Sequence, residues 1–261
     1  MRGLLLRISV GAVLVLGCTA VFAETQAPEK RQALWTIVHD RCVPGQIDKN
    51  DPAPCAAVVL PNGDPAQGHV VLKDRKGDAQ YLVMPTELIS GIEDSHVLAL
   101  ETPNYFTYAW QAKALVEERL GKKLAREDVS IAVNSAYGRT QDLLHLHVDC
   151  VRTDVREALR VALPKIGYHW SRKPIALGSH HYYTLRLDGE DSLKASPFRL
   201  LAQGLHVKAK DMGAWTLVVT GAHFADGKNG FVLLADKANT ALGNVGSGEE
   251  LQDHDCKLRN E

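Results

Sequence analysis

The 261-residue sequence has no excess of charge of either sign, because 30 Lys and Arg residues stand against 31 Asp and Glu residues, for a net charge of -1. It contains no block of Lys or Arg and no low-complexity tract. Without a basic field, a nucleic-acid-binding protein is not expected. The hydrophobic content of 45% is enough to bury a core over this length, which excludes disordered and fibrous classes.

The sequence also lacks a linker rich in Pro, Gly or Ser, and none of its five cysteines forms a Cys-x-x-Cys pair. The absence of a linker predicts one compact unit over residues 24–261 rather than independent domains. The absence of Cys-x-x-Cys pairs argues against a structural Cys/His metal site.

The first 23 residues have the layout of a secretory signal. Arg2 and Arg7 come before or at the edge of an apolar run, residues 8–23, which ends in small residues at Ala23. Three outcomes stay open: cleavage after Ala23, lipidation of Cys18 at an imperfect lipoprotein-type box, or retention as a membrane anchor. A run of 16 residues is short for a spanning helix, which needs about 20. All three outcomes imply export.

Four cysteines follow this segment: Cys42, Cys55, Cys150 and Cys256. In an oxidising compartment an even set predicts two disulfides, and three pairings are allowed. We favour Cys42–Cys55, because the segment between them is rich in turn-forming residues, and closing that loop would contribute about 3 kcal/mol in the chain-entropy model. The remaining pair is then Cys150–Cys256, which would tie the end of a strand to the carboxyl-terminal tail.

Hydrophobic periodicity predicts an α+β chain. A helix is expected around residues 32–41, and an amphipathic helix over residues 105–120 that begins at Asn104 and ends at Gly121. Asp154 and Glu157 have the spacing of a capping box and predict a helix to about residue 163. Strands are expected over residues 68–74, 79–85, 129–134, 143–150, 214–219 and 230–235.

The hairpin expected over residues 214–235 repeats the shape of the one over residues 68–84. Two βαβ-like halves that arose by duplication, at about 24–165 and 166–261, would explain the repeat. Independent hairpins, which any α+β chain contains, explain it equally well.

The strongest chemical signal is the pair His145 and His147. Alternate residues of a strand share a face, so the two imidazoles would lie side by side, with Leu144 and Leu146 on the opposite face. A neutral imidazole, with a usual pKa of about 6.5, can attack phosphorus, and a second imidazole can orient it or handle protons. Alone, the pair fits metal ligation, nucleophilic catalysis and a merely polar sheet face equally well.

Residues around the pair favour phosphoryl chemistry. Gly138, Arg139 and Thr140 form an expected turn just before the strand and offer backbone N–H groups, a guanidinium and a hydroxyl to phosphate oxygens. Asn134, at the end of the preceding strand, adds an amide donor. Each residue by itself is more simply explained as a turn residue, a solvated charge or the start of a strand. Together, beside two histidines, they predict a phosphoryl-binding site.

Residues 143–149, Leu-Leu-His-Leu-His-Val-Asp, resemble the histidine-triad (HIT) motif His-φ-His-φ-His-φ-φ, in which φ is apolar. Residues 80–86 resemble a second strand of that superfamily. More specifically, nearly the whole chain after the signal resembles the bacterial CDP-diacylglycerol pyrophosphatase family. The matching stretches are GHVVLKD (68–74), YLVMPT (81–86), PNYFTYAWQA (103–112), GRTQ (138–141), HLHVDC (145–150), SPF (196–198), FVLLA (231–235) and QDH (252–254), together with the four cysteines.

The resemblance implies a HIT-like α+β fold, an antiparallel sheet with flanking helices, over residues 24–261. It implies hydrolysis of CDP-diacylglycerol to CMP and phosphatidate, with no metal or other cofactor. His145 maps to the nucleophile and His147 to the third triad histidine, while Leu143 replaces the first. Asn134 and Thr140 map near the phosphate-contacting amide and hydroxyl of the superfamily, although the Asn134 spacing is shorter than usual.

The implied substrate lies in a membrane, so we expect a membrane-surface enzyme on the periplasmic side of the bacterial inner membrane, anchored or peripheral. The resemblance leaves the oligomeric state open. The helix at residues 105–110 is a candidate wall for the cytidine, and His180 and His181 have no assigned role.

Two other functions stay open. One is a metal-dependent phosphoesterase with His145, His147 and Asp149 as ligands. The other is a non-catalytic lipid- or nucleotide-binding protein, an alternative raised by the loss of the first triad histidine.

Overall fold

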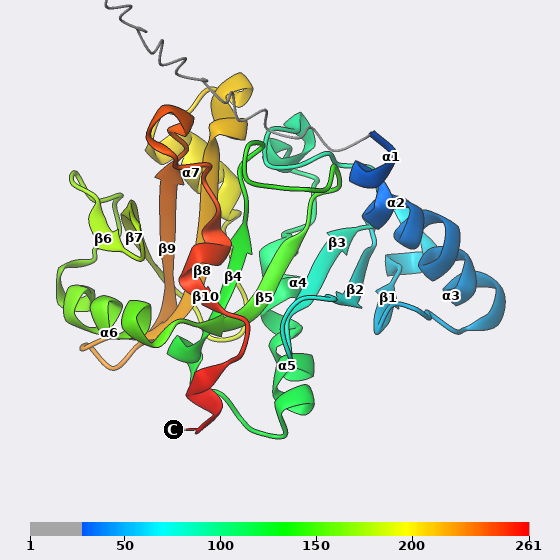
Figure 1. The fold of residues 1–261 in the computed structure, drawn as a ribbon, viewed down its shortest axis with the longest axis horizontal. Coiled ribbons are helices and arrows are strands. Elements are labelled where there is room, and N and C mark those ends of the chain that lie inside the picture. The colour runs from blue at the N-terminus through cyan, green and yellow to red at the C-terminus, as the bar shows by residue number, and fades with distance from the viewer. Residues whose placement is uncertain (1–27, 261) are drawn as a thin grey trace, which may run out of the picture.

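The computed structural model describes residues 28–260 (Figure 1). The expected signal or anchor, with its alternatives at Ala23 and Cys18, lies outside the described residues. Within residues 28–260, no helix combines the length and apolar character that a bilayer crossing requires.

The strands form one antiparallel sheet, so the structure is α+β, as the sequence predicted. The strand order is β1-β2-β3-β5-β4-β8-β9-β7-β6, and the short β10 pairs with the end of β5. The strands are β1 (Ala57–Val59), β2 (His69–Lys73), β3 (Tyr81–Pro85), β4 (Val129–Val133), β5 (Leu146–Val151), β6 (Ile175–Leu177), β7 (His180–Asp188), β8 (Trp215–His223), β9 (Asn229–Lys237) and β10 (Gln252–Asp253).

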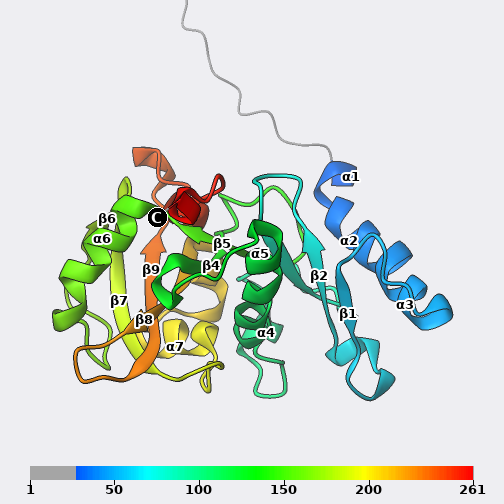
Figure 2. The same ribbon diagram turned by 90° about the horizontal axis from the view of Figure 1, so that it is seen from below.

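Helices cover both faces of this sheet (Figure 2). A π-helical turn, Val38–Cys42, joins α2 to α3, and a 3₁₀ turn, Gly248–Leu251, precedes β10. The α-helices are α1 (Pro28–Arg31), α2 (Ala33–Ile37), α3 (Val43–Lys49), α4 (Tyr105–Gln111), α5 (Lys113–Leu120), α6 (Thr153–Ala162) and α7 (Pro197–Gly204).

One face of the sheet is apolar along most of its width. Residues of seven strands, such as Val83, Leu146 and Leu233, pack with α4, α5 and α7 in one cluster. Burial of these side chains stabilises the fold by about 25 cal/mol for each Å² of apolar surface removed from water.

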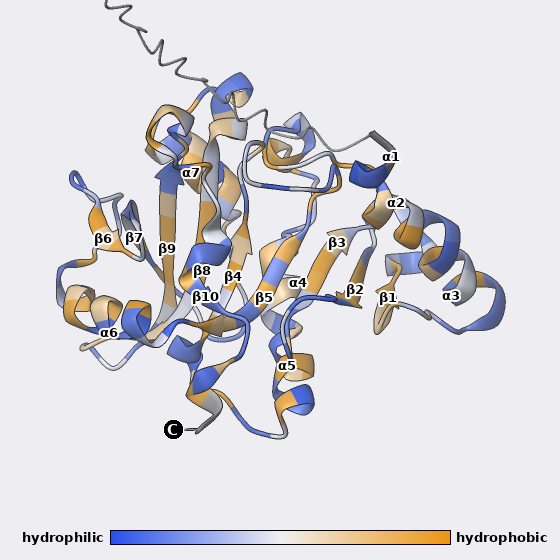
Figure 3. Cartoon of the chain, viewed as in Figure 1, coloured by the Kyte–Doolittle hydropathy of each residue, from blue (hydrophilic) through white to orange (hydrophobic). Residues whose placement is uncertain are grey.

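The opposite face carries two separate apolar clusters. One joins β2, β3 and Leu143 to α2 and the π-helical turn, and the other joins β8 and β9 to α6. Between the clusters, β5 and β4 present buried polar residues that include His147, Asp149 and Ser130. Polar positions therefore interrupt the apolar pattern of β5 (Figure 3). The carboxyl-terminal segment crosses this polar strip, because β10 pairs with β5.

Apart from β1 at its edge, the strand order has the same pattern from both ends. The set β2-β3-β5-β4 meets the set β8-β9-β7-β6 where Ile131 of β4 lies opposite Val219 of β8. In each set the chain forms one hairpin, then helix on the shared apolar face, and then a second hairpin. The second strand of the first hairpin pairs with the second strand of the other hairpin, β3 with β5 in one set and β7 with β9 in the other.

The predicted helix over residues 105–120 is broken in two, since α4 ends at Gln111 and α5 begins at Lys113. Asn104 does not cap it, because its side-chain amide donates instead to the carbonyls of Leu193 and Ala195 at 2.6 and 3.2 Å. Gly121 ends α5 with a φ of 65°, as predicted, because glycine adopts the left-handed region without a steric penalty.

The segment between Cys42 and Cys55 is less turn-like than expected, because residues 43–49 form α3. Pro44 sits in the first turn of that helix, where its missing N–H removes no helical hydrogen bond. The predicted capping box of α6 is also wrong: Asp154 pairs with Arg152 instead of capping the helix.

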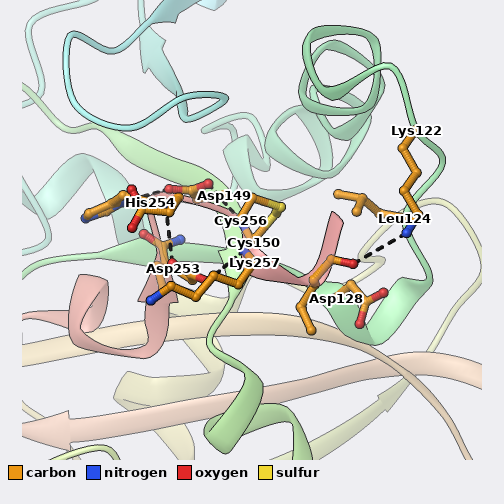
Figure 4. The surroundings of a disulfide bond; sticks show 12 residues. Lys122, Leu124, Asp128, Asp149, Cys150, Asp253, His254, Cys256 and Lys257 are labelled. Carbon is orange, nitrogen blue, oxygen red and sulfur yellow. Dashed lines mark hydrogen bonds and ion pairs between the residues drawn. A yellow bond between two sulfur atoms is a disulfide. The ribbon is translucent and has the colours of Figure 1, made fainter. Parts of the chain in front are cut away.

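Both disulfides favoured from the sequence are present in the structure. Cys42–Cys55 ties the π-helical turn to the loop before β1, and Cys150–Cys256 ties β5 to the carboxyl-terminal segment (Figure 4). Two disulfides fit an exported protein.

Candidate active site

A cavity of about 1060 Å³ lies over the polar strip of the sheet and contains both histidines of the motif. Its walls come from α2, the turn between β2 and β3, the loop before β5, and the carboxyl-terminal segment. Apolar side chains (Ala33, Leu34, Ile37, Pro54, Leu72, Leu82) and cationic ones (Arg41, Lys73, Arg75, Lys76) both line it.

His145 lies directly before β5 and is only 7% exposed. Its Nδ1 is 2.6 Å from the carbonyl oxygen of Leu143. Because a carbonyl can only accept, Nδ1 carries the proton and Nε2 keeps its lone pair. Burial lowers the pKa of His145, which favours this neutral form. The imidazole is thus oriented and uncharged, as a nucleophile must be.

His147 lies beside His145 with the ring centroids 4.8 Å apart. Gln80 donates from Nε2 to Nδ1 of His147 at 3.1 Å, so the proton of the neutral ring is on Nε2. That Nε2 is buried and has no hydrogen-bond partner within the described residues, although Oε1 of Glu249 is 3.4 Å away. Burial lowers the pKa of His147 to about 3. His147 therefore offers an N–H group to an incoming oxygen.

Three of the four expected phosphate-contacting residues line the cavity: Asn134, Gly138 and Thr140. The side chain of Asn134 already has two partners. It donates from Nδ2 to Oε1 of Glu249 at 2.7 Å and accepts from the hydroxyl of Ser247 at 3.2 Å. Asn134 thus holds a carboxylate in this structure.

Arg139, the fourth expected residue, does not line the cavity. Its guanidinium donates to both carboxylate oxygens of Glu93, at 2.6 and 2.7 Å, and lies 3.2 Å from Asp142. The side chain is only 9% exposed. The structure therefore places Arg139 where it fixes the loop that carries Gly138 and Thr140.

The carboxyl-terminal segment adds two groups that the sequence analysis missed, Glu249 and His254. Nδ1 of His254 is 2.7 Å from Oδ2 of Asp149, and its Nε2 is 3.7 Å from Oε2 of Glu249. Figure 4 shows His254 beside Asp149 and next to the Cys150–Cys256 bond. A signal was available, because that pairing brings the residues next to Cys150 and Cys256 close together.

The charges of these groups depend on their burial and their partners. Burial raises the pKa of Asp149, and the hydrogen bond to Asp149 raises that of His254. Burial by itself would raise the pKa of Glu249 as well. The neighbouring His147, the Asn134 hydrogen bond and Lys76 outweigh it, so the pKa of Glu249 lies below its usual value. Glu249 is thus a largely buried, ionised carboxylate.

The other residues considered from the sequence lie elsewhere or have other partners. The helix at residues 105–110 packs on the opposite face of the sheet, so it does not wall this cavity. His180 hydrogen-bonds Glu250 at 2.8 Å, and His181 is exposed. Among the described residues, no three His, Cys, Asp or Glu side chains are placed to hold a metal ion.

Comparison with known proteins identifies the family of this chain. A family model described as CDP-diacylglycerol pyrophosphatase matches residues 29–260. A CDP-diacylglycerol pyrophosphatase of Yersinia pestis is 39% identical over 226 residues, which are 87% of this chain and 84% of the relative. The chain therefore belongs to the CDP-diacylglycerol pyrophosphatase family.

Proposed function

We propose that this chain hydrolyses CDP-diacylglycerol to CMP and phosphatidate through a cytidylyl intermediate on His145. The observation that carries the mechanism is the hydrogen bond from Nδ1 of His145 to the Leu143 carbonyl, which leaves a lone pair on Nε2 in the cavity. The family membership supports the substrate.

In the first half-reaction, Nε2 of His145 forms a bond to the phosphorus next to cytidine. The bond from that phosphorus to the bridging oxygen breaks, and phosphatidate leaves with the electron pair. A phosphate monoester is a good leaving group, so this step needs no strong general acid. In the second half-reaction, water replaces Nε2 on phosphorus and releases CMP.

Donors and charges around the cavity suit this chemistry. The unpartnered Nε2–H of His147, backbone N–H groups of the loop at residues 138–140 and the hydroxyl of Thr140 can stabilise charge that develops on the phosphoryl oxygens. Lys73 and Lys76 supply positive charge at the cavity wall, where a diphosphate needs it. The apolar wall on α2, with Leu34 and Ile37, suits the glyceride end of the substrate.

Membrane association is part of the same proposal. The wall on α2 begins ten residues after the end of the apolar run of residues 8–23. A chain held at the periplasmic surface of the inner membrane by that run, or peripheral to it, would meet the lipid end of its substrate there.

The fold supports a HIT-like architecture made of two related halves. The evidence is the strand order, which apart from β1 has the same pattern from both ends, and the helix between hairpins in each set. On the face where β5 presents its histidines, the corresponding strand β9 presents Val232 and Leu234. The first half would therefore carry the reaction.

Labelled CDP-diacylglycerol and two quench conditions test the mechanism. A phosphoramidate on histidine survives an alkaline quench and is lost in acid, so the labelled CMP–protein adduct should show that stability and disappear in His145→Ala. Unchanged turnover in His145→Ala would refute the nucleophile. Loss of turnover in EDTA would favour the metal-dependent alternative, and absence of any turnover would favour the binding protein.

A further inference from the structure

Glu249 is the least expected group in the cavity, because the proposed substrate is an anion. Its side chain is 15% exposed and lies between His147 and His254, at 3.4 and 3.7 Å. A carboxylate repels phosphoryl oxygens, so Glu249 does not suit the role of a phosphate ligand. Its placement needs another explanation.

The protein holds this carboxylate in place through several contacts. Asn134 donates to Oε1 at 2.7 Å, and Gln80 lies 3.5 Å from Oε2. The backbone before it rests directly on the sheet, since a Cβ on Gly248 would come within 2.6 Å of Val218 and 2.9 Å of Thr216. Only glycine allows that close approach. The position of Glu249 is therefore built into the fold.

The two half-reactions make different demands on the site. The first step needs no base, because His145 attacks through a lone pair that is already free. The second step needs one, because attacking water must lose a proton. His147 is a poor acceptor, since burial lowers its pKa to about 3. Glu249 is the ionised carboxylate nearest to the pair.

We propose that Glu249 is the general base of the second half-reaction, and that His254, held by Asp149, positions it. Water forms the new P–O bond, the P–Nε2 bond breaks with its electrons returning to His145, and the water proton passes to Glu249. The negative charge of the bound cytidylyl group raises the proton affinity of the carboxylate at that stage. His254 lies 2.7 Å from the buried Asp149 and 3.7 Å from Glu249, so it fixes the position of the Glu249 carboxylate before water attacks.

This inference rests on the proposed function. An experiment can test it because the two half-reactions can be followed separately. In Glu249→Gln we expect a burst of about one phosphatidate per enzyme, followed by turnover at least 100-fold slower than wild type. The alkali-stable CMP–protein adduct should accumulate in this variant. Formate should restore part of the second step in Glu249→Ala, which a merely structural role would not allow. His254→Gln should keep the burst and slow the second step less.

Glu117→Gln is the matched control. Glu117 is also a buried carboxylate, 6% exposed, but it pairs with Lys113 and Lys123 outside the cavity. This control should keep the wild-type burst and turnover.

Two results would overturn the inference, and they distinguish a wrong nucleophile from a wrong general base. If His145→Ala turns over normally, the nucleophile is wrong and Glu249 has no second half-reaction to assist. If His145 is essential but Glu249→Gln shows wild-type turnover, or loses burst and turnover together while remaining folded by circular dichroism, the base assignment alone is wrong.

Discussion

Nδ1 of His145 donates its hydrogen to the main-chain carbonyl of Leu143, 2.6 Å away. Leu143, which stands where the resembled histidine-triad motif has its first histidine, therefore orients the proposed nucleophile through its backbone, whatever its side chain is. The Leu143 side chain is fully buried in the cluster beneath α2, with Val38 and Leu82. A leucine at this position of the resembled motif is thus compatible with an oriented nucleophile.

Substitutions of Leu143 should affect stability more than chemistry. Leu143→Ala removes packed methyl groups and should lower the free energy of unfolding by about 2–5 kcal/mol. Leu143→His would bury an imidazole without a built-in partner and should also destabilise. Urea unfolding and kcat below the unfolding midpoint measure the two effects. A higher kcat in Leu143→His would contradict this interpretation of the site.

The acid limb of activity should lie below the usual histidine range. The proposed nucleophile His145 must be neutral to attack, and burial lowers its pKa from 6.5, so it should stay neutral as the pH falls through 6.5. The pH profile of kcat/KM should therefore decline with a midpoint below pH 6.5. Folding checked at each pH separates titration from unfolding. A midpoint at or above 6.5 would show that His145 is not held in the neutral form.

Stability should fall in the same pH range for a different reason. Burial lowers the pKa of His69, which stacks on Tyr108, to about 4. Between pH 6.5 and about 4 the unfolded chain binds a proton that the folded chain does not, so stability falls as the pH falls, by up to about 1.4 kcal/mol per pH unit. His69→Phe should flatten this part of the curve, measured by urea unfolding. An equally steep curve in the variant would assign the acid sensitivity to other groups.

Arg139 should act as a structural residue. The substitution Arg139→Ala removes the contacts of this side chain to Glu93 and Asp142. The Arg139–Glu93 ion pair is only partly exposed. We expect the free energy of unfolding to fall by about 1–3 kcal/mol. This is less than for a fully buried ion pair, because Glu93 is 28% exposed. KM for CDP-diacylglycerol should change less than in Thr140→Ala. A large rise in KM without loss of thermal stability would restore Arg139 as a phosphate contact.

The Cys150–Cys256 bond should matter for activity as well as for stability. It closes a separation of 106 residues, against 13 for Cys42–Cys55, so the chain-entropy model gives it the larger contribution, about 4.7 against about 3 kcal/mol. It also holds the segment that carries Glu249 and His254. Replacing Cys150 and Cys256 by Ala should reduce kcat more than replacing Cys42 and Cys55, at a temperature where both variants are folded. Equal kcat values would show that β10 pairing alone holds the segment.

Local sequence determined much of this protein. Apolar runs bounded by turn residues predicted β2 and β3, and a two-residue period predicted β4 and β5. The histidine pair and the loop residues Gly138 and Thr140 were likewise predicted to lie together, because they are close in the chain. Cysteine count and turn composition favoured the two disulfides that the structure contains.

Tertiary structure decided what depends on residues far apart in sequence. The sequence could not predict that Asn104 binds the segment before α7 or that Arg139 pairs with Glu93. Contacts between residues far apart in the chain produce no periodic pattern in the local sequence. The largest omission was the carboxyl-terminal segment, which β10 and a disulfide place over β5. Local spacing was enough to propose the nucleophile, whereas folding brought Glu249 and His254 to it across about 100 residues of chain.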